Sequence, residues 1–217
     1  MRIALIILSV LTITSCTSKV VKDSTHANSR DTTILLKDAL GQLKLTIPNR
    51  YDTFLVWTQR SDCGSCGTER YRFQRKRLPI FKESGFYWYD LKDSIDQLTI
   101  IHPQYIIVRD SASTDIIKDH HKKMLIKAKS DPMVYRDKNI FDTLLLINGR
   151  WNSLIIASSY DTLTRQYSKA VWGALLQKGN IINIQFSLLT KIKDSTNENF
   201  INDSRQQIMR IFQGNGT

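Results

Sequence analysis

The chain has 217 residues, of which 41% are hydrophobic and 24% are charged. This composition is typical of a globular protein and excludes a disordered chain, and the lack of any repeat period excludes a solenoid. The 31 Lys and Arg residues exceed the 20 Asp and Glu residues, which gives a formal net charge of +11. A solvated basic face is the simplest interpretation, and it would favour anionic lipid, polysaccharide or an acidic protein. We expect no nucleic-acid partner, because the basic residues cluster only in residues 70–77.

The first residues resemble a bacterial lipoprotein signal peptide. A basic start at Arg2 precedes an apolar stretch over residues 3–13, and Cys16 follows shortly after it. Ile13 lies three places before this cysteine and the small Ser15 lies directly before it, as such signals require. The apolar stretch is about half as long as the roughly 20 residues that span a bilayer, so it does not predict a transmembrane helix. A plain secretory signal and an internal strand are the alternatives.

The resemblance implies that residues 1–15 are removed and that a lipidated Cys16 anchors the mature chain to a membrane. The residue after the cysteine is Thr17 and not aspartate, which, by similarity to enteric lipoproteins, implies sorting to the outer membrane. Residues 16–32 are polar and have no apolar period, so we expect the lipidated cysteine to be followed by a flexible tether. The expected location is the bacterial cell envelope.

Residues 33–213 are predicted to form a single domain whose first half consists mainly of β-strands. Short runs alternate apolar and polar residues and are rich in β-branched and aromatic types, which favours strands over helices. The predicted strands of this first half are residues 34–36, 43–47, 53–58, 69–77, 86–89 and 105–108.

A helix is predicted next, beginning near Ser113 as its N-cap and ending before Asp131-Pro132. One side of this helix carries an apolar stripe made of Ile117, His120, Met124 and Ala128.

The second half of the domain predicts a four-strand meander and a terminal helix. Asn148-Gly149 between residues 143–147 and 151–157 predicts a hairpin with a type I′ turn. Two more strands, residues 169–177 and 181–189, are joined around Gly179-Asn180. The last helix begins with a capping box from Ser195 to Glu198 and ends near Gly214; its stripe contains Phe200, Ile201, Ser204, Ile208, Ile211 and Phe212.

This order of elements predicts an α+β fold, in which a mostly antiparallel sheet carries a central and a C-terminal amphipathic helix. The order resembles that of the PsbP-like family. The resemblance rests on Pro48 and Tyr51 after an early strand, on the Asn148-Gly149 turn, and on the amphipathic helix over residues 200–212. It implies a PsbP-like sandwich that acts as a binding or assembly factor, and no catalytic residues carry over.

Cys63 and Cys66 enclose a four-residue turn, whose end Cα atoms lie within about 7 Å of each other, close enough for a disulfide. In an oxidising compartment this pair predicts a staple at the tip of the hairpin that joins residues 53–60 to 68–77.

The alternative interpretation of Cys63 and Cys66 is a thiol-disulfide oxidoreductase site, with Cys63 as nucleophile and Cys66 as resolving cysteine. Residues 36–41, 54–57 and 142–146 resemble segments of membrane-anchored thioredoxin-like proteins. No tryptophan precedes Cys63, the cis-proline position is taken by Asp142, and the residues after Cys66 alternate like a strand.

Metal binding by the two cysteines would need two further ligands, for which His102, His120 and His121 are available. Adjacent histidines on a helix point apart, and His120 lies on the apolar stripe, so we expect a core histidine and no metal site. We interpret Asp90, Asp93 and Asp96 as a solvated helix face and residues 86–89 as core.

These observations lead to one expectation of function. We expect a lipid-anchored, non-catalytic binding or assembly factor with a protein or envelope partner, no metal and no cofactor.

Overall fold

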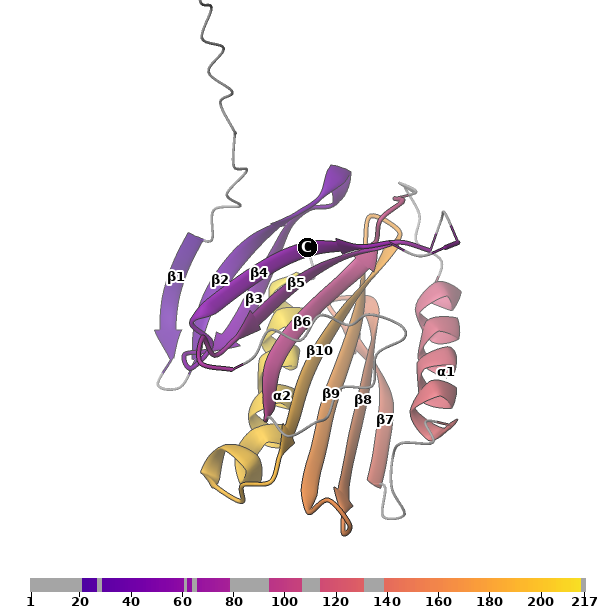
Figure 1. Ribbon diagram of the computed structural model, residues 1–217. Coiled ribbons are helices and arrows are strands. Elements are labelled where there is room, and N and C mark those ends of the chain that lie inside the picture. Colours follow the sequence, from indigo (N-terminus) through magenta and orange to yellow (C-terminus); the bar gives the residue numbers. More distant parts are fainter. Residues whose placement is uncertain are drawn as a thin grey trace, which may run out of the picture.

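The structure is a computed structural model, and it describes residues 21–26, 29–60, 62–63, 66–78, 94–106, 114–130 and 139–215. The described elements form an α+β fold, as predicted, with two antiparallel sheets and two α-helices (Figure 1). Cys16 and residues 86–89 lie outside the described residues, as do Asp90 and Asp93.

The larger sheet has seven strands in the order β4-β5-β6-β10-β9-β8-β7, and all its pairs are antiparallel. Its strands are β4 (Thr53–Gln59), β5 (Thr68–Gln74), β6 (Ile95–Pro103), β7 (Asn139–Ile147), β8 (Arg150–Asp161), β9 (Gln166–Gln177) and β10 (Asn180–Thr190). The predicted hairpin of β4 and β5 and the meander of β7 to β10 are confirmed. Strand β6 lies between the hairpin and the meander and joins them into one sheet, because it pairs with both β5 and β10.

The smaller sheet has three strands, β1 (Val21–His26), β2 (Ser29–Leu36) and β3 (Gly41–Pro48). A 3-10 turn, η1 (Asp38–Leu40), joins β2 to β3. The tether expected over residues 16–32 is corrected here, because from Val21 onward most of these residues lie in strands. Ser29 and Thr32 are buried, so polar side chains in this segment pack within the fold.

The two tight turns of the meander use backbone conformations that few residues adopt. Asn148 has φ 50° and Gly149 has φ 73°, as the predicted type I′ turn requires. The second turn is formed by Lys178, with φ 48°, and Gly179, with φ 76°. It therefore lies one residue earlier than the predicted position at Gly179-Asn180.

One face of the large sheet packs against α2 (Ser195–Gly214) and the small sheet to form the hydrophobic core. The core contains residues of both sheets and the α2 stripe, among them Phe200, Ile208 and Phe212. The close approach of α2 depends on Gly173 in β9, since a Cβ there would lie 3.0 Å from Ile208 and from Phe212. This contact fixes the sheet face that α2 covers.

The other helix, α1 (Thr114–Ser130), contacts β7, β8 and β9. Its His121 contacts Ser153 of β8, whereas α2 contacts Gly173, which is paired with Leu154. Neighbouring residues of a strand point to opposite faces. The two helices therefore lie on opposite faces of the sheet (Figure 1).

Several predicted boundaries differ from the structure. Strand β6 was not predicted, and Tyr105 and Ile106, expected in a strand, lie after it. β5 ends at Gln74, before the predicted end at Arg77. The N-cap of α2 is Asp194 and not Ser195, because the Asp194 side chain accepts a hydrogen bond from the backbone N–H of Asn197.

Candidate functional site

The Cys63–Cys66 disulfide closes the turn between β4 and β5, with the two Cα atoms 5.2 Å apart. The backbone N–H of Cys66 donates to the carbonyl of Cys63 at 2.8 Å, which completes a tight turn. Both cysteines are exposed. The pair therefore lies at the hairpin tip, where the sequence predicted a staple.

The chain that follows Cys66 forms strand β5 from Thr68 onward. A thioredoxin-like site places its nucleophilic cysteine at a helix N-terminus, where the helix dipole stabilises the thiolate. No helix begins at this turn among the described residues, since the nearest element on each side is a strand. This geometry lacks the feature that lowers a cysteine pKa in that fold.

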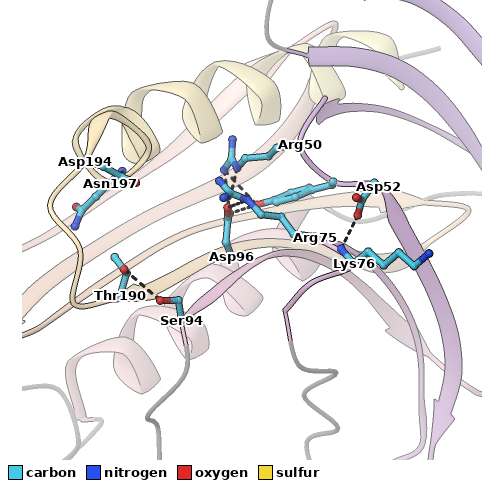
Figure 2. Close-up of polar contacts among 10 residues, drawn as sticks. Arg50, Asp52, Arg75, Lys76, Ser94, Asp96, Thr190, Asp194 and Asn197 are labelled. Carbon is cyan, nitrogen blue, oxygen red and sulfur yellow. Dashed lines mark hydrogen bonds and ion pairs between the residues drawn. The ribbon is translucent and has the colours of Figure 1, made fainter.

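A second cluster surrounds the carboxylate of Asp96 at the start of β6, which is 4% exposed. The Arg50 guanidinium donates from Nε to Oδ2 at 2.8 Å and from Nη2 to Oδ1 at 3.0 Å. Tyr51 donates its hydroxyl to Oδ1 at 2.7 Å, and the Arg75 Nε lies 3.0 Å from Oδ2. Figure 2 shows Arg50 and Arg75 converging on Asp96. The interpretation of Asp96 as part of a solvated helix face is therefore wrong.

The Asp96 cluster shifts the titration of the groups around it. Burial alone would lower the pKa of Arg50, but the hydrogen bond and the charge of Asp96 raise it above its ordinary value. Burial raises the pKa of Tyr51 well above its ordinary value, and the negative charge of Asp96 raises it further. Arg50 and Tyr51 follow β3 of the small sheet, so the cluster joins the two sheets by charged hydrogen bonds.

The basic cluster predicted within residues 70–77 divides between the two faces of the β5 region. Arg72 is completely buried, donates from Nε to the Thr99 hydroxyl at 3.1 Å and lies over the Trp57 ring at 4.8 Å. Burial, together with the neighbouring Arg70, lowers the pKa of Arg72 to about 10. Arg75 binds Asp96 instead, so this cluster does not form one continuous basic surface.

The third cluster joins α1 to the large sheet through its two histidines. His121 lies with Nδ1 2.8 Å from the Ser153 hydroxyl and with Nε2 3.1 Å from Asp142 Oδ2. His120 lies with Nε2 2.7 Å from Asn183 Oδ1 on β10. Of the two α1 histidines, His121 is thus the buried one, whereas the stripe prediction named His120, which is half-buried.

Ser153, His121 and Asp142 are the residue types of a hydrolase triad, but their arrangement differs from one. In such triads the serine contacts Nε2 and the carboxylate contacts Nδ1, and the serine faces the substrate. Here the two contacts are exchanged on the ring, and Ser153 is 3% exposed beneath α1. This cluster therefore binds α1 to the sheet.

The remaining histidine that was considered as a metal ligand, His102, is fully buried in β6. Its Nε2 lies 3.3 Å from the Tyr71 hydroxyl, and its Nδ1 lies 2.7 Å from the carbonyl of Pro103. Within the part of the chain that the structure describes, no three His, Cys, Asp or Glu side chains are grouped as a metal site would require.

Among the strands that the structure describes, β7 is the outermost one of the large sheet at the α1 end, and it pairs only with β8 (Figure 1). Its nine residues include a single charged residue, Asp142, and no proline. Two large apolar side chains on it are more than half exposed, Phe141 at 51% and Leu146 at 59%. Edge strands are usually protected by lysine, proline or a bulge, because their outward N–H and C=O groups can pair with another chain. The sequence pattern predicted this strand but not its position at the edge of the sheet.

No protein-family model matches this chain, and no curated protein matches it in sequence. Among the described helices, neither α1 nor α2 has a stretch that is both long and apolar enough to cross a bilayer.

Proposed function

We propose that this chain is a lipid-anchored protein of the bacterial cell envelope, whose α+β domain binds a protein or envelope partner without catalysing a reaction.

 The anchor is the lipidated Cys16, and the domain is similar to the PsbP-like sandwich. The expected membrane is the outer one.

The envelope location is supported by two features that lie far apart in the sequence. Ile13, Ser15 and Cys16 have the spacing of a lipoprotein signal. Cys63 and Cys66 form a disulfide, and structural disulfides persist in oxidising compartments such as the periplasm and the cell surface.

The observation that carries the binding proposal is the exposed edge strand β7, with Phe141 and Leu146 both more than half exposed. Such an edge can add a strand of a partner to the sheet, and the main-chain hydrogen bonds then supply much of the affinity.

A redox function remains the second candidate, because Cys63 and Cys66 are both exposed and an external thiol could reach them. We expect the reduction potential of the purified full chain to lie well below the range of roughly −120 to −270 mV that oxidoreductases have, with no reduction of insulin. A potential within that range, together with turnover of insulin, would establish the redox function instead.

The anchor is tested by expressing the full chain and its Cys16→Ala variant in a bacterium. We expect the mature wild-type chain to begin at Cys16, to carry the mass of its acyl chains and to partition into detergent. The variant should lose both the added mass and the partitioning. A wild-type chain that is cut elsewhere and carries no lipid would refute the anchor.

The binding function is tested in the same cells with a photo-crosslinking residue placed singly at Val56, Leu146 and Leu163, three exposed positions on different parts of the domain. A binding factor should give a discrete adduct from at least one position, and the purified partner should rebind the full chain. If none of the three positions gives a discrete adduct, the result would count against a binding role.

A further inference from the structure

The outer side of β7 has backbone groups that are directed away from the sheet. Ile147 and Arg150 flank the two-residue turn, and in such a hairpin the flanking pair is hydrogen-bonded. Hydrogen bonding to β8 then recurs at every second residue, at Leu145 and Thr143. The N–H and C=O groups of Asp142 and Leu144 consequently point outward, toward the position of a further strand.

The side chains beside that position differ between the two faces of the sheet. Asp142 contacts His121, so the even-numbered residues of β7 point to the face that α1 covers. Phe141 points to the opposite face, because neighbouring strand residues alternate. A strand added to β7 would therefore meet α1 on one face and the exposed Phe141 ring on the other.

The flank of α1 that faces outward past β7 is basic. His120 reaches Asn183 on β10, near the middle of the sheet, and His121 reaches Asp142 on β7. Residues of a helix are about 100° apart, so continuing the same rotation places further side chains beyond the edge of the sheet. The residues that this rotation places there are Lys118, Lys122, Leu125 and Lys129, together with Asp115 near the start of the helix, so this flank carries three lysines against one aspartate.

An independent contact supports this placement of the basic flank. The Lys118 ammonium lies 5.5 Å from the centre of the Trp151 ring, and Trp151 is paired with Leu146 of β7. Lys122 is exposed on the same flank. By the same rotation, Lys123 lies on the other flank, where its charge acts on His120.

We propose that the β7 edge and the lysine flank of α1 form the docking site for an extended acidic segment of a partner protein, which adds to the large sheet as an eighth strand. The segment would alternate acidic residues, facing Lys118, Lys122 and Lys129, with apolar residues that pack beside Phe141. This inference deepens the proposed binding function and rests on it. A second copy of this chain fits the edge less well, because it would bring two lysine flanks together.

The probe for this site is a short capped, dye-labelled peptide that alternates valine with glutamate, and its control alternates valine with lysine. Both are titrated with the full chain by fluorescence anisotropy. We expect the glutamate peptide to bind at least about tenfold more tightly than the lysine peptide, and to weaken as salt is added. The absence of binding by the glutamate peptide, or equal binding of both peptides, would overturn the proposal.

Two matched charge variants localise the binding. Lys122→Glu and Lys123→Glu change the net charge equally on neighbouring residues of one helix, but on opposite flanks. We expect Lys122→Glu to weaken binding of the glutamate peptide about threefold or more, and Lys123→Glu to leave it nearly unchanged. Equal effects of the two variants would mean that the peptide responds only to overall charge, and the site would be wrong.

The backbone contribution is tested by Leu144→Pro, which removes an outward N–H and leaves the bonds to β8 in place. We expect this variant to lose peptide binding while the circular dichroism spectrum stays that of the wild-type chain. Leu146→Glu, on an exposed side chain, is the second variant should Leu144→Pro fail to fold, and it should weaken binding of the glutamate peptide by repulsion. Full binding by either folded variant would overturn the proposal.

Light scattering of the full chain tests whether a second copy of this chain, and not an acidic segment of a partner, occupies the β7 edge. A dimer that Leu146→Glu dissociates would assign the edge to a second copy and overturn the acidic-segment proposal. If these tests contradict the docking site at β7 but discrete adducts still form from Val56 or Leu163, the proposed binding function stands and only its location is wrong.

Discussion

The guanidinium of Arg50 holds the carboxylate of Asp96 through two hydrogen bonds, at 2.8 Å and 3.0 Å. Arg50 follows the last strand of the small sheet, and Asp96 lies in β6 of the large sheet, between β5 and β10. This ion pair therefore joins two sheets whose strands do not pair with each other in the described residues. Its position predicts a role in stability.

Asp96→Asn keeps the side-chain volume but removes the negative charge between Arg50 and Arg75. We expect the free energy of unfolding to fall by about 3 kcal/mol, because two largely buried guanidinium groups lose their counter-charge. Urea unfolding at neutral pH measures the change. Asp52→Asn, at an exposed carboxylate nearby, is the control and should have a much smaller effect. Similar losses from both variants would contradict this prediction.

Tyr51→Phe removes the hydroxyl that donates to Asp96 and leaves the buried ring in place. We expect a loss of about 2 kcal/mol of stability, typical of a buried hydrogen bond to a charged group. The pKa of Tyr51 is raised by burial and by Asp96, so its folded value exceeds its unfolded value. Its contribution is therefore complete below about pH 10, the unfolded value, and is lost as the pH rises toward the folded pKa.

The measurement for Tyr51 is urea unfolding of both chains from neutral pH to above pH 10. The difference between them should shrink only at the alkaline end. A difference that already shrinks between pH 7 and pH 9 would be inconsistent with the direction of the shift.

We expect the titration of His120 to lower the free energy of unfolding in acid. Burial lowers its pKa, with Lys123 and His121 acting in the same direction and the hydrogen bond to Asn183 opposing them. Since the folded pKa lies below the unfolded one, the contribution is complete above about pH 6.5 and is lost as the pH falls through the folded value. His120→Gln can still donate toward Asn183 but cannot titrate. We expect the decrease in unfolding free energy from pH 7.5 to pH 5 to be smaller in this variant, and an equal decrease would refute the assignment.

Gly173→Ala tests the approach of α2 to the sheet. The added Cβ would lie 3.0 Å from Ile208 and from Phe212, so the helix must shift. We expect a loss of about 1–3 kcal/mol, as for other overpacked cores. Phe212→Leu shortens one of the opposing side chains, and the double variant should lose less stability than the two single changes summed. Strict additivity in urea unfolding would show that the two side chains do not meet.

The Cys63→Ser, Cys66→Ser double variant removes the staple at the tip of the β4–β5 hairpin. The closed loop is very short, so chain entropy predicts a loss of only about 2 kcal/mol. Thermal unfolding of the variant, compared with the oxidised chain, measures this loss. A chain that no longer folds after the double substitution would show that the disulfide contributes more than a local loop constraint.

Most of the local structure could be predicted from patterns within single segments of the chain. Alternation identified β4 and β5, Asn148-Gly149 specified a type I′ turn, and spacing at three and four residues identified the buried stripe of α2. Each of these depends on residues that are close together in the chain, so a pattern in one segment is sufficient to detect it. The four-residue spacing of the cysteines predicted their disulfide in the same way.

The starts of strands within polar surroundings, and the strands that lie at an edge, could be identified only from the folded arrangement of the chain. Asp96 looked solvated because its neighbours in the chain are polar, yet its partners Arg50 and Tyr51 lie some 45 residues away. The exposed side of β7 and the lysine flank of α1 likewise follow from strand order and helix rotation, which no single segment encodes. Burial of a charge and exposure of an edge are properties of contacts between distant segments, and those contacts exist only once the chain has folded.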